Sequence, residues 1–156
     1  MAQTKAHAKK TPSAAPPAGK AKVHAAPPPR PAHGAFIWNE LMTHDPEAAK
    51  AFYSKSIGWH YEPMPMADGS TYWIIKMGDH MAGGIFHMTG PHFEKMPDQW
   101  VSYIGVDDVD ARVKKAVAAG ARVMREPFDV PKVGRIAYLH QPGGAVICWM
   151  TPSPQM

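Results

Sequence analysis

The sequence predicts a single α+β domain in which two βαβββ modules form a curved mixed sheet around a cleft. The main observation is an internal repeat. The order of strand, helix and three strands occurs twice, and corresponding landmarks such as Trp38 and Trp100 stand 62 residues apart. A second observation is that each expected helix begins at an acidic N-cap and ends before a glycine. With 156 residues, the chain has the length of one ordinary domain with a tail, which argues against separate cofactor and substrate domains.

The first module is predicted at residues 34–90. A strand at 35–42 precedes a helix with Asp45 as its N-cap and Pro46 at the first helical position, where the missing N–H costs nothing. Gly58 supplies the left-handed stop. The apolar residues of this helix are spaced to form one stripe, which consists of Ala48, Ala49, Phe52, Tyr53 and Ile57. Further strands are expected at residues 59–64, 71–77 and 81–88.

The second module is predicted at residues 98–152. A strand at 100–106 leads into a helix that starts at Asp107 or Asp108 and runs to Ala119, before Gly120. Its apolar stripe consists of Val109, Val113, Ala116 and Val117. Further strands are expected at residues 122–128, 135–140 and 145–150. Two such helix-backed sheets, placed side by side, enclose a cleft that suits a small ligand.

Residues 1–33 form a tail of distinct composition, with seven of the seventeen prolines, six Lys or Arg residues and no Asp, Glu or aromatic residue. Such a segment cannot bury enough apolar surface to offset the entropy of ordering it, so it is predicted to be disordered. The tail carries +6 and the whole chain +4, so the body carries about −2. A nucleic-acid partner is therefore not expected, except through weak attraction to the tail.

The chain contains one cysteine, Cys148, which excludes an intrachain disulfide and a cysteine-based zinc cage. No stretch approaches eighteen consecutive apolar residues, so no membrane-spanning helix is expected. A reducing cytoplasm is the predicted location.

Three segments of the body resemble the vicinal oxygen chelate superfamily, which includes glyoxalase I, bleomycin-resistance proteins and extradiol dioxygenases. The segments are 45–59 (DPEAAKAFYSKSIGW), 106–120 (VDDVDARVKKAVAAG) and 134–149 (GRIAYLHQPGGAVICW). The likeness covers nearly all of residues 34–152 and is closest to small bacterial glyoxalase-like proteins. It implies the two-module fold and a homodimer. It leaves the function open, because this superfamily contains lyases, oxygenases, epimerases and simple binding proteins.

The resemblance also implies where a metal ion would be held, since metal-dependent members place ligands on the first and last strands of each module. The matching positions are Trp38, Trp100 or Val101, a position near Phe86, and Cys148. None of these is a histidine or a carboxylate, so no metal is expected there and a lyase of the glyoxalase type is not favoured. An ion bound by His87 and neighbouring residues is the alternative.

Glu40 is the candidate catalytic residue. If Trp38 faces the cleft, the two-residue alternation of a strand turns Glu40 toward the cleft as well. A buried carboxyl group has a raised pKa unless it is paired, which suits a general base or a hydrogen-bonding anchor for a ligand. In the alternative interpretation, Glu40 lies at the strand edge and pairs with a lysine or a backbone amide.

A ligand-binding surface is predicted from aromatic residues on the strands, because indole and phenyl faces stack on flat molecules. The candidate ligand-binding residues are Trp38, Glu40, Phe86, Tyr103 and Cys148. Cys148 is expected to be a pocket or core residue rather than a nucleophile, because no activating histidine or helix N-terminus is predicted beside it. The alternative is that half of the aromatic residues are ordinary core.

Three functions are compatible with these observations. The favoured one is recognition of a small, flat, largely apolar molecule without a metal ion or another cofactor. The second is an enzyme of the same superfamily, of lyase or dioxygenase type, that uses Glu40 or a divalent metal ion. The third is a dimeric interaction protein whose tail binds an anionic partner.

Overall fold

The computed structural model describes residues 33–154. The predicted tail lies outside the described residues, apart from His33. Eight strands and two helices follow one another in the predicted order. The elements are β1 (Phe36–Thr43), α1 (Pro46–Ile57), β2 (His60–Pro65), β3 (Thr71–Met77), β4 (His80–His87), β5 (Gln99–Gly105), α2 (Val109–Ala118), β6 (Arg122–Val130), β7 (Gly134–His140) and β8 (Val146–Pro152).

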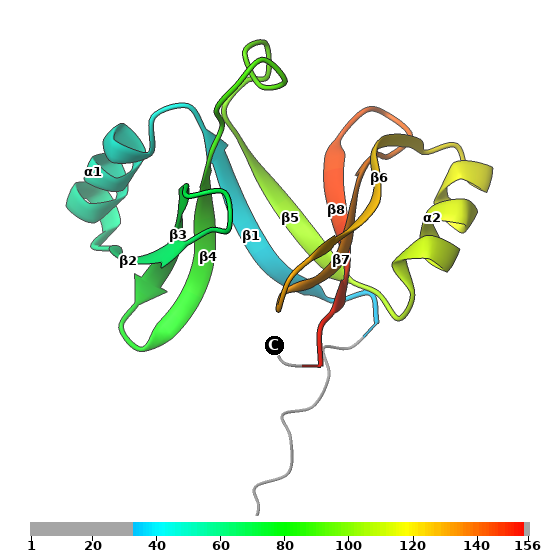
Figure 1. Ribbon diagram of the computed structural model, residues 1–156, viewed down its shortest axis with the longest axis horizontal. Coiled ribbons are helices and arrows are strands. Elements are labelled where there is room, and N and C mark those ends of the chain that lie inside the picture. Colours follow the sequence, from blue (N-terminus) through cyan, green and yellow to red (C-terminus); the bar gives the residue numbers. More distant parts are fainter. Residues whose placement is uncertain (1–32, 155–156) are drawn as a thin grey trace, which may run out of the picture.

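The strands form one continuous mixed sheet in the order β2-β3-β4-β1-β5-β8-β7-β6. The first strand of each module lies at the centre, where β1 pairs with β5 in antiparallel fashion, and each pairs in parallel with the last strand of its own module. Figure 1 shows the sheet curving into an open U, with α1 and α2 on its outer sides. The predicted α+β fold of two βαβββ modules is confirmed.

The helix boundaries follow from the predicted caps. Asp45 accepts a hydrogen bond from the amide of Ala48 and Asp108 does the same for Ala111, so each carboxylate satisfies a free N–H of the first helical turn. Gly58 closes α1 in the left-handed conformation, at φ 77°. In α2 the cap is Ala119, with a right-handed backbone, and the left-handed Gly120 comes one residue later.

The spacing of the repeat is corrected by these boundaries. The two N-caps, Asp45 and Asp108, stand 63 residues apart, and so do the starts of β1 and β5. The spacing of 62 between Trp38 and Trp100 therefore joins residues that are not equivalent. Trp38 corresponds to Val101, which is fully buried on the inner face of the sheet, whereas Trp100 is 40% exposed.

Three clusters of buried side chains make up the core. Two of them lie between the sheet and a helix. One joins α2 to β7 and β8 through residues such as Val109 and Leu139, and the other joins Ala49 and Tyr53 of α1 to Leu41, Ile75 and Ile85. The third contains no helix residue and covers the inner, concave face of the sheet. Its buried members are Met42, Met88, Val101, Tyr103, Ile136, Cys148 and Met150.

The predicted apolar stripe of α1 is confirmed only in part, because Ala49 and Tyr53 pack against the sheet whereas Phe52 and Ile57 do not. Phe52 and Ile57 are 62% and 58% exposed, and the only buried residue of the helix is Pro46. In α2, by contrast, Val109, Val113 and Ala116 are all buried against the sheet. The difference arises because Ala49, Tyr53 and Lys50, rather than Phe52 and Ile57, lie between α1 and the sheet. In the described part of the chain, neither helix has the length and hydropathy that a membrane span requires.

Candidate functional site

A row of side chains crosses the inner face of the sheet at its centre. The register places Trp38 of β1 opposite Tyr103 of β5, Tyr103 beside Cys148 of β8, and Cys148 opposite Tyr138 of β7. Residues directly opposite each other on neighbouring strands point to the same face, so these four side chains form one surface. Three of the predicted ligand-binding residues belong to it.

Glu40 lies beside this row and is buried, with 6% of its surface exposed. Its Oε1 atom accepts a hydrogen bond of 2.8 Å from the Tyr103 hydroxyl and a longer one of 3.3 Å from the Tyr138 hydroxyl. The two hydroxyl oxygens are 2.5 Å apart. Because Tyr103 donates to Glu40, it can accept from Tyr138, which links the three groups into one network. Glu40 therefore lies on a central strand, and within the described residues it pairs with neither a lysine nor a backbone amide.

Tyr72 of β3 completes the network from the first module, whereas Tyr103 and Tyr138 belong to the second. Its hydroxyl accepts a 2.9 Å hydrogen bond from the indole N–H of Trp38, which leaves its own proton free to be donated toward Glu40. The ring of Tyr72 reaches this place by lying over Gly84, the residue paired with Glu40 on β4. A Cβ atom on Gly84 would come within 1.9 Å of the Tyr72 hydroxyl oxygen. Glycine is thus required at position 84 by a close approach.

Burial dominates the electrostatics of the cluster. Loss of solvent raises the pKa of Glu40, and the hydrogen bonds from Tyr103, Tyr72 and Tyr138 only partly oppose this. Burial, followed by the nearby Glu40 charge, also raises the pKa of all three tyrosines. The same two causes raise the pKa of the Cys148 thiol well above its usual range. A thiol with a raised pKa is a poor nucleophile.

Aromatic residues border the cluster at both ends. Phe86, the remaining predicted ligand-binding residue, packs at 5.6 Å against Phe93, which lies in the segment between β4 and β5. At the other end, Phe128 stacks on Tyr138 with ring centroids 6.5 Å apart, and the guanidinium of Arg125 lies 3.4 Å over the Phe128 ring. The inner face is thus lined by aromatic rings around one buried acid.

Tyr72 and Tyr138 belong to the site but were not among the predicted residues. Each lies on a strand that was predicted, but neither could be assigned to the inner face without the pairing register. The signal for Tyr72 is Gly84, because a glycine inside a strand indicates close approach by another group. The signal for Tyr138 is its register with Cys148, which follows from the tight turn between β7 and β8.

The residues at the superfamily's metal positions do not fit a metal ion. They are Trp38, Val101 and Cys148, and in the fourth place the register offers Gly84 as well as the nearby Phe86. Three of these side chains have no donor atom for a metal, the indole N–H of Trp38 can only donate, and Cys148 alone cannot make a site. Within residues 33–154 no three His, Cys, Asp or Glu side chains are grouped to hold an ion.

The histidines considered for an alternative metal site have other contacts. His87 Nε2 lies 3.1 Å from the carbonyl oxygen of His44, and His140 Nδ1 lies 2.9 Å from that of Gly144. His44 itself pairs with Asp98 at 2.7 Å. These contacts fix loops and turns near the sheet ends, and within residues 33–154 His87 belongs to no group of three side chains that could hold an ion.

The fold and the inner-face site define a protein of the vicinal oxygen chelate class, as the resemblance implied. Residues 38–150 match the model of a family described as the glyoxalase-like domain, and the chain belongs to this family. The matched residues include both modules from Trp38 to Met150, so the family assignment covers the whole inner face.

Two curated relatives carry names that bear on function. The chain is 43% identical over 122 residues to the "Putative glyoxylase CFP32" of Mycobacterium tuberculosis, a match that covers 78% of this chain and 46% of the relative. It is 32% identical over 125 residues to the anthracycline biosynthesis protein DnrV of Streptomyces peucetius, covering 73% and 46%. The chain thus spans about half the length of the curated relatives it matches.

Solved structures share the fold at low sequence identity. A hypothetical protein of Bacillus halodurans superposes with a TM-score of 0.58 at 14% identity, covering 77% of this chain and 95% of that one. Methylmalonyl-CoA epimerase from Mycobacterium tuberculosis superposes with a TM-score of 0.55 at 18% identity, covering 78% and 89%. These likenesses confirm the architecture alone.

The pH dependence of stability should reveal the buried carboxyl of Glu40. Its pKa is raised in the folded state above the ordinary value of 4.5. At pH values between the pKa of Glu40 in the unfolded chain and its higher pKa in the folded chain, the folded chain holds a proton that the unfolded chain lacks. The free energy of unfolding therefore falls as pH rises through this range. Glu40→Gln cannot titrate and should lose this contribution. In urea unfolding at pH of about 4.5 and about 8, the free energy of wild type minus that of Glu40→Gln is expected to decrease.

The control for this experiment is Glu94→Gln, which removes a carboxyl at an exposed position. The free energy of unfolding of wild type minus that of Glu94→Gln should not decrease between these two pH values. A difference for Glu40→Gln that stays constant or increases with pH would contradict the raised pKa.

Proposed function

We propose that the inner face of the sheet binds a small, flat, largely apolar molecule that carries a polar group, without the metal ion of metal-dependent relatives. The observation that carries this proposal is the buried Glu40, surrounded by three tyrosine hydroxyls in the middle of an aromatic surface. A plain structural core would not need this arrangement, because burying an ionisable group costs free energy that apolar packing avoids.

The aromatic part of the site supports a flat ligand. Trp38 is partly exposed, and its indole N–H is already bonded to Tyr72, so the plane of the ring is held before any ligand arrives. A fixed ring loses little conformational entropy on binding and offers a large face for stacking. Tyr138 and Phe128 offer a second pair of stacked rings across the inner face.

The polar part of the site supports one directional contact at the centre. Glu40 has little exposed surface, and it already accepts from Tyr103 and Tyr138. A hydroxyl or carbonyl group of a ligand would therefore join the tyrosine hydroxyls as a further member of the network. The relative DnrV is named for anthracycline biosynthesis, and anthracyclines are flat polycyclic aromatic molecules with hydroxyl and carbonyl groups. This chemical class fits the proposed site.

An enzyme that transfers a proton through Glu40 is the second candidate. The specific observation in its favour is the raised pKa of Glu40, caused by burial, in contact with the Tyr103 hydroxyl. A carboxyl group whose pKa is raised keeps its proton to higher pH than an ordinary carboxyl group, which favours a role as general acid or base. The name of the mycobacterial relative, a glyoxylase, also favours an enzyme. In this case the chemistry would be carried by Glu40 and the tyrosines.

The remaining parts of the proposal concern association and location. A homodimer is proposed because the edge strands β2 and β6 leave backbone groups open to pairing, and because Met77 and Met81 are exposed at the turn between β3 and β4. A cytoplasmic location is proposed from the single, buried Cys148. The third candidate, an interaction protein with an anion-binding tail, concerns a segment outside the described residues.

Ligand titration tests the proposed site. Replacement of Trp38 by Ala should weaken the best hit of a small aromatic library that contains hydroxyanthraquinones by about tenfold, because stacking contributes on the order of 1 kcal/mol beyond buried area. Glu40→Gln should spare folding but change the affinity or its pH dependence. Calorimetric titration of wild type and each variant gives the affinities.

Trp100→Ala is the matched control for this titration. Trp100 is also a partly exposed tryptophan of a central strand, but it packs against Tyr53 and Trp59 on the outer side of the sheet. Its loss should leave the affinity unchanged. Equal affinities for wild type, Trp38→Ala and Glu40→Gln, with all three folded, would place the ligand elsewhere.

Metal analysis tests the proposed absence of an ion. The side chains at the superfamily's metal positions do not fit a metal, so protein purified without chelators should contain less than stoichiometric zinc, nickel, iron or manganese by elemental analysis. One bound ion per chain would overturn this part of the proposal. A sample treated with a chelator and then dialysed against each metal serves as the control for loss during purification.

Light scattering tests the proposed dimer. At micromolar concentration the measured mass should be about twice the chain mass of 17.1 kDa. Dilution should shift the mass toward the monomer if the association is reversible. A mass of one chain over the whole accessible concentration range would rule the dimer out.

A further inference from the structure

The two modules differ at the contact between helix and sheet. Lys50 is the fifth residue after the N-cap of α1, and Val113 is the fifth after that of α2. The residues beneath them also differ. Trp73 of β3 and Ala137 of β7 occupy equivalent positions. In the first module Ile85 pairs with both Leu41 and Trp73. In the second module Trp149 pairs with both Ile104, the counterpart of Leu41, and Ala137. A cation over an indole in the first module thus replaces an apolar contact in the second.

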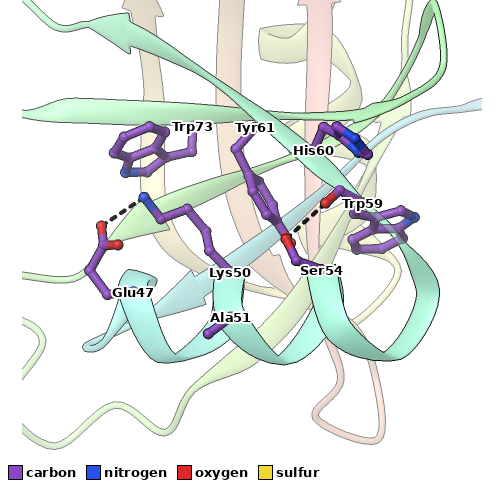
Figure 2. Close-up of a pocket in the computed structure, with 8 residues that line it drawn as sticks. All are labelled: Glu47, Lys50, Ala51, Ser54, Trp59, His60, Tyr61 and Trp73. Atoms are coloured by element: carbon purple, nitrogen blue, oxygen red, sulfur yellow. Dashed lines mark hydrogen bonds and ion pairs between the residues drawn. The ribbon is translucent and has the colours of Figure 1, made fainter.

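An open hollow results from this difference. Beneath α1, on the outer side of β2 and β3, lies a hollow of about 610 Å³ that is open to solvent. A smaller hollow of about 160 Å³ beside α2 lies at a different place, toward β8, and neither Val113 nor Ala137 lines it. Figure 2 shows the larger hollow, with α1 on one side and Trp73, Tyr61 and Trp59 along the other. It lies on the opposite face of the sheet from Glu40.

A largely buried cation lines this hollow. The side chain of Lys50 is 13% exposed, and its ammonium lies 3.2 Å from the centre of the Trp73 ring. Its ionic partner, Glu47, stands 2.7 Å away, but the Glu47 side chain is 78% exposed. The cation is therefore fixed in the wall while its anion can rotate into solvent. An anionic group of a ligand can take the place of Glu47 with little rearrangement.

Aromatic groups and a spare donor lie next to the cation. Trp59 is held by stacking on Tyr53, with ring centroids 4.9 Å apart, so its orientation does not depend on a ligand. The buried hydroxyl of Tyr61 has no hydrogen bond of good geometry within the described residues. The nearby Ser54 hydroxyl donates instead to the carbonyl of Trp59, at 2.9 Å. The hollow thus combines a positive charge with ring faces and an unused polar group.

We propose that this hollow is a second small-molecule site, which binds a planar aromatic carboxylate. The carboxylate pairs with Lys50 in place of Glu47, and the ring lies against Trp59 and Tyr61. A cationic ligand is disfavoured because the face of Trp73 is already occupied by Lys50. A purely structural role for Lys50 is also disfavoured, because Val113 closes the equivalent contact in α2 without a charge. The site is independent of the function proposed for the inner face.

The test uses the full chain, labelled with ¹⁵N, and 2-naphthoate as the probe. Titration should shift the indole N–H signals of Trp59 and Trp73, which are assigned with Trp→Phe variants. Lys50→Met keeps the length of the side chain and should raise the dissociation constant by about tenfold, the effect expected for one charge-assisted contact. Glu47→Gln frees Lys50 from its partner and should lower the dissociation constant. The neutral isostere 2-naphthamide should bind wild type as weakly as 2-naphthoate binds Lys50→Met.

Two matched variants separate this site from other effects. Lys55→Met removes the same charge from the exposed last turn of α1 and should leave the dissociation constant unchanged. Glu40→Gln alters the inner face and should also leave it unchanged. The proposal is overturned if wild type and Lys50→Met bind 2-naphthoate equally, if Glu47→Gln binds no more tightly, or if the shifts appear at Trp38 instead. It is also overturned if wild type shows no saturable binding of 2-naphthoate. If Lys50→Met fails to fold, the dissociation constant of Glu47→Gln serves as the test instead.

Discussion

The antiparallel pairing of β1 with β5 is the contact on which the rest of the structure depends. It joins two modules, each with a sheet of only four strands, into one continuous sheet, and it gives them a common inner face. Because the pairing is symmetric, Trp38 faces Tyr103 and Glu40 faces Val101, so each central strand contributes to the same row of side chains. A shift of one residue in this register would turn Glu40 to the outer side of the sheet and break its hydrogen bonds with the tyrosines.

The contents of this symmetric frame are not symmetric. Glu40 corresponds to Tyr103, Gly84 to Cys148 and, on the outer side, Lys50 to Val113. In each pair the first module has a charged residue or a glycine where the second has a larger or apolar side chain. The second module is packed closely around α2, whereas the first holds both the buried acid and the partly buried cation. Both proposed binding surfaces depend on residues of the first module for their charge.

Most of the fold and the position of Glu40 could be predicted from the sequence, because they depend on patterns among neighbouring residues. Caps such as Asp45 and the alternation of Trp38 and Glu40 depend only on neighbouring residues, so the strands, the helices and the position of Glu40 on the inner face were accessible. The partners of Glu40 were not, because Tyr72 and Tyr138 reach it through the register of distant strands. The spacing of the repeat was wrong by one residue because it was taken from Trp38 and Trp100, whereas the N-caps Asp45 and Asp108 stand 63 residues apart.

The exposed apolar residues of α1 show why the spacing of apolar residues does not always predict which face of a helix is buried. The spacing of Phe52 and Ile57 is that of a buried stripe, yet both are exposed, because the contact of α1 with the sheet is made by Ala49 and Tyr53 and by Lys50 over Trp73. A long lysine side chain can cover apolar surface with its methylene groups while its charge finds an aromatic face, and periodicity does not detect this. The hollow beneath α1 is a consequence of that contact. Ala49, Tyr53 and the Lys50–Trp73 pair hold α1 against the sheet and leave this space open, whereas Val109, Val113 and Ala116 of α2 are all buried.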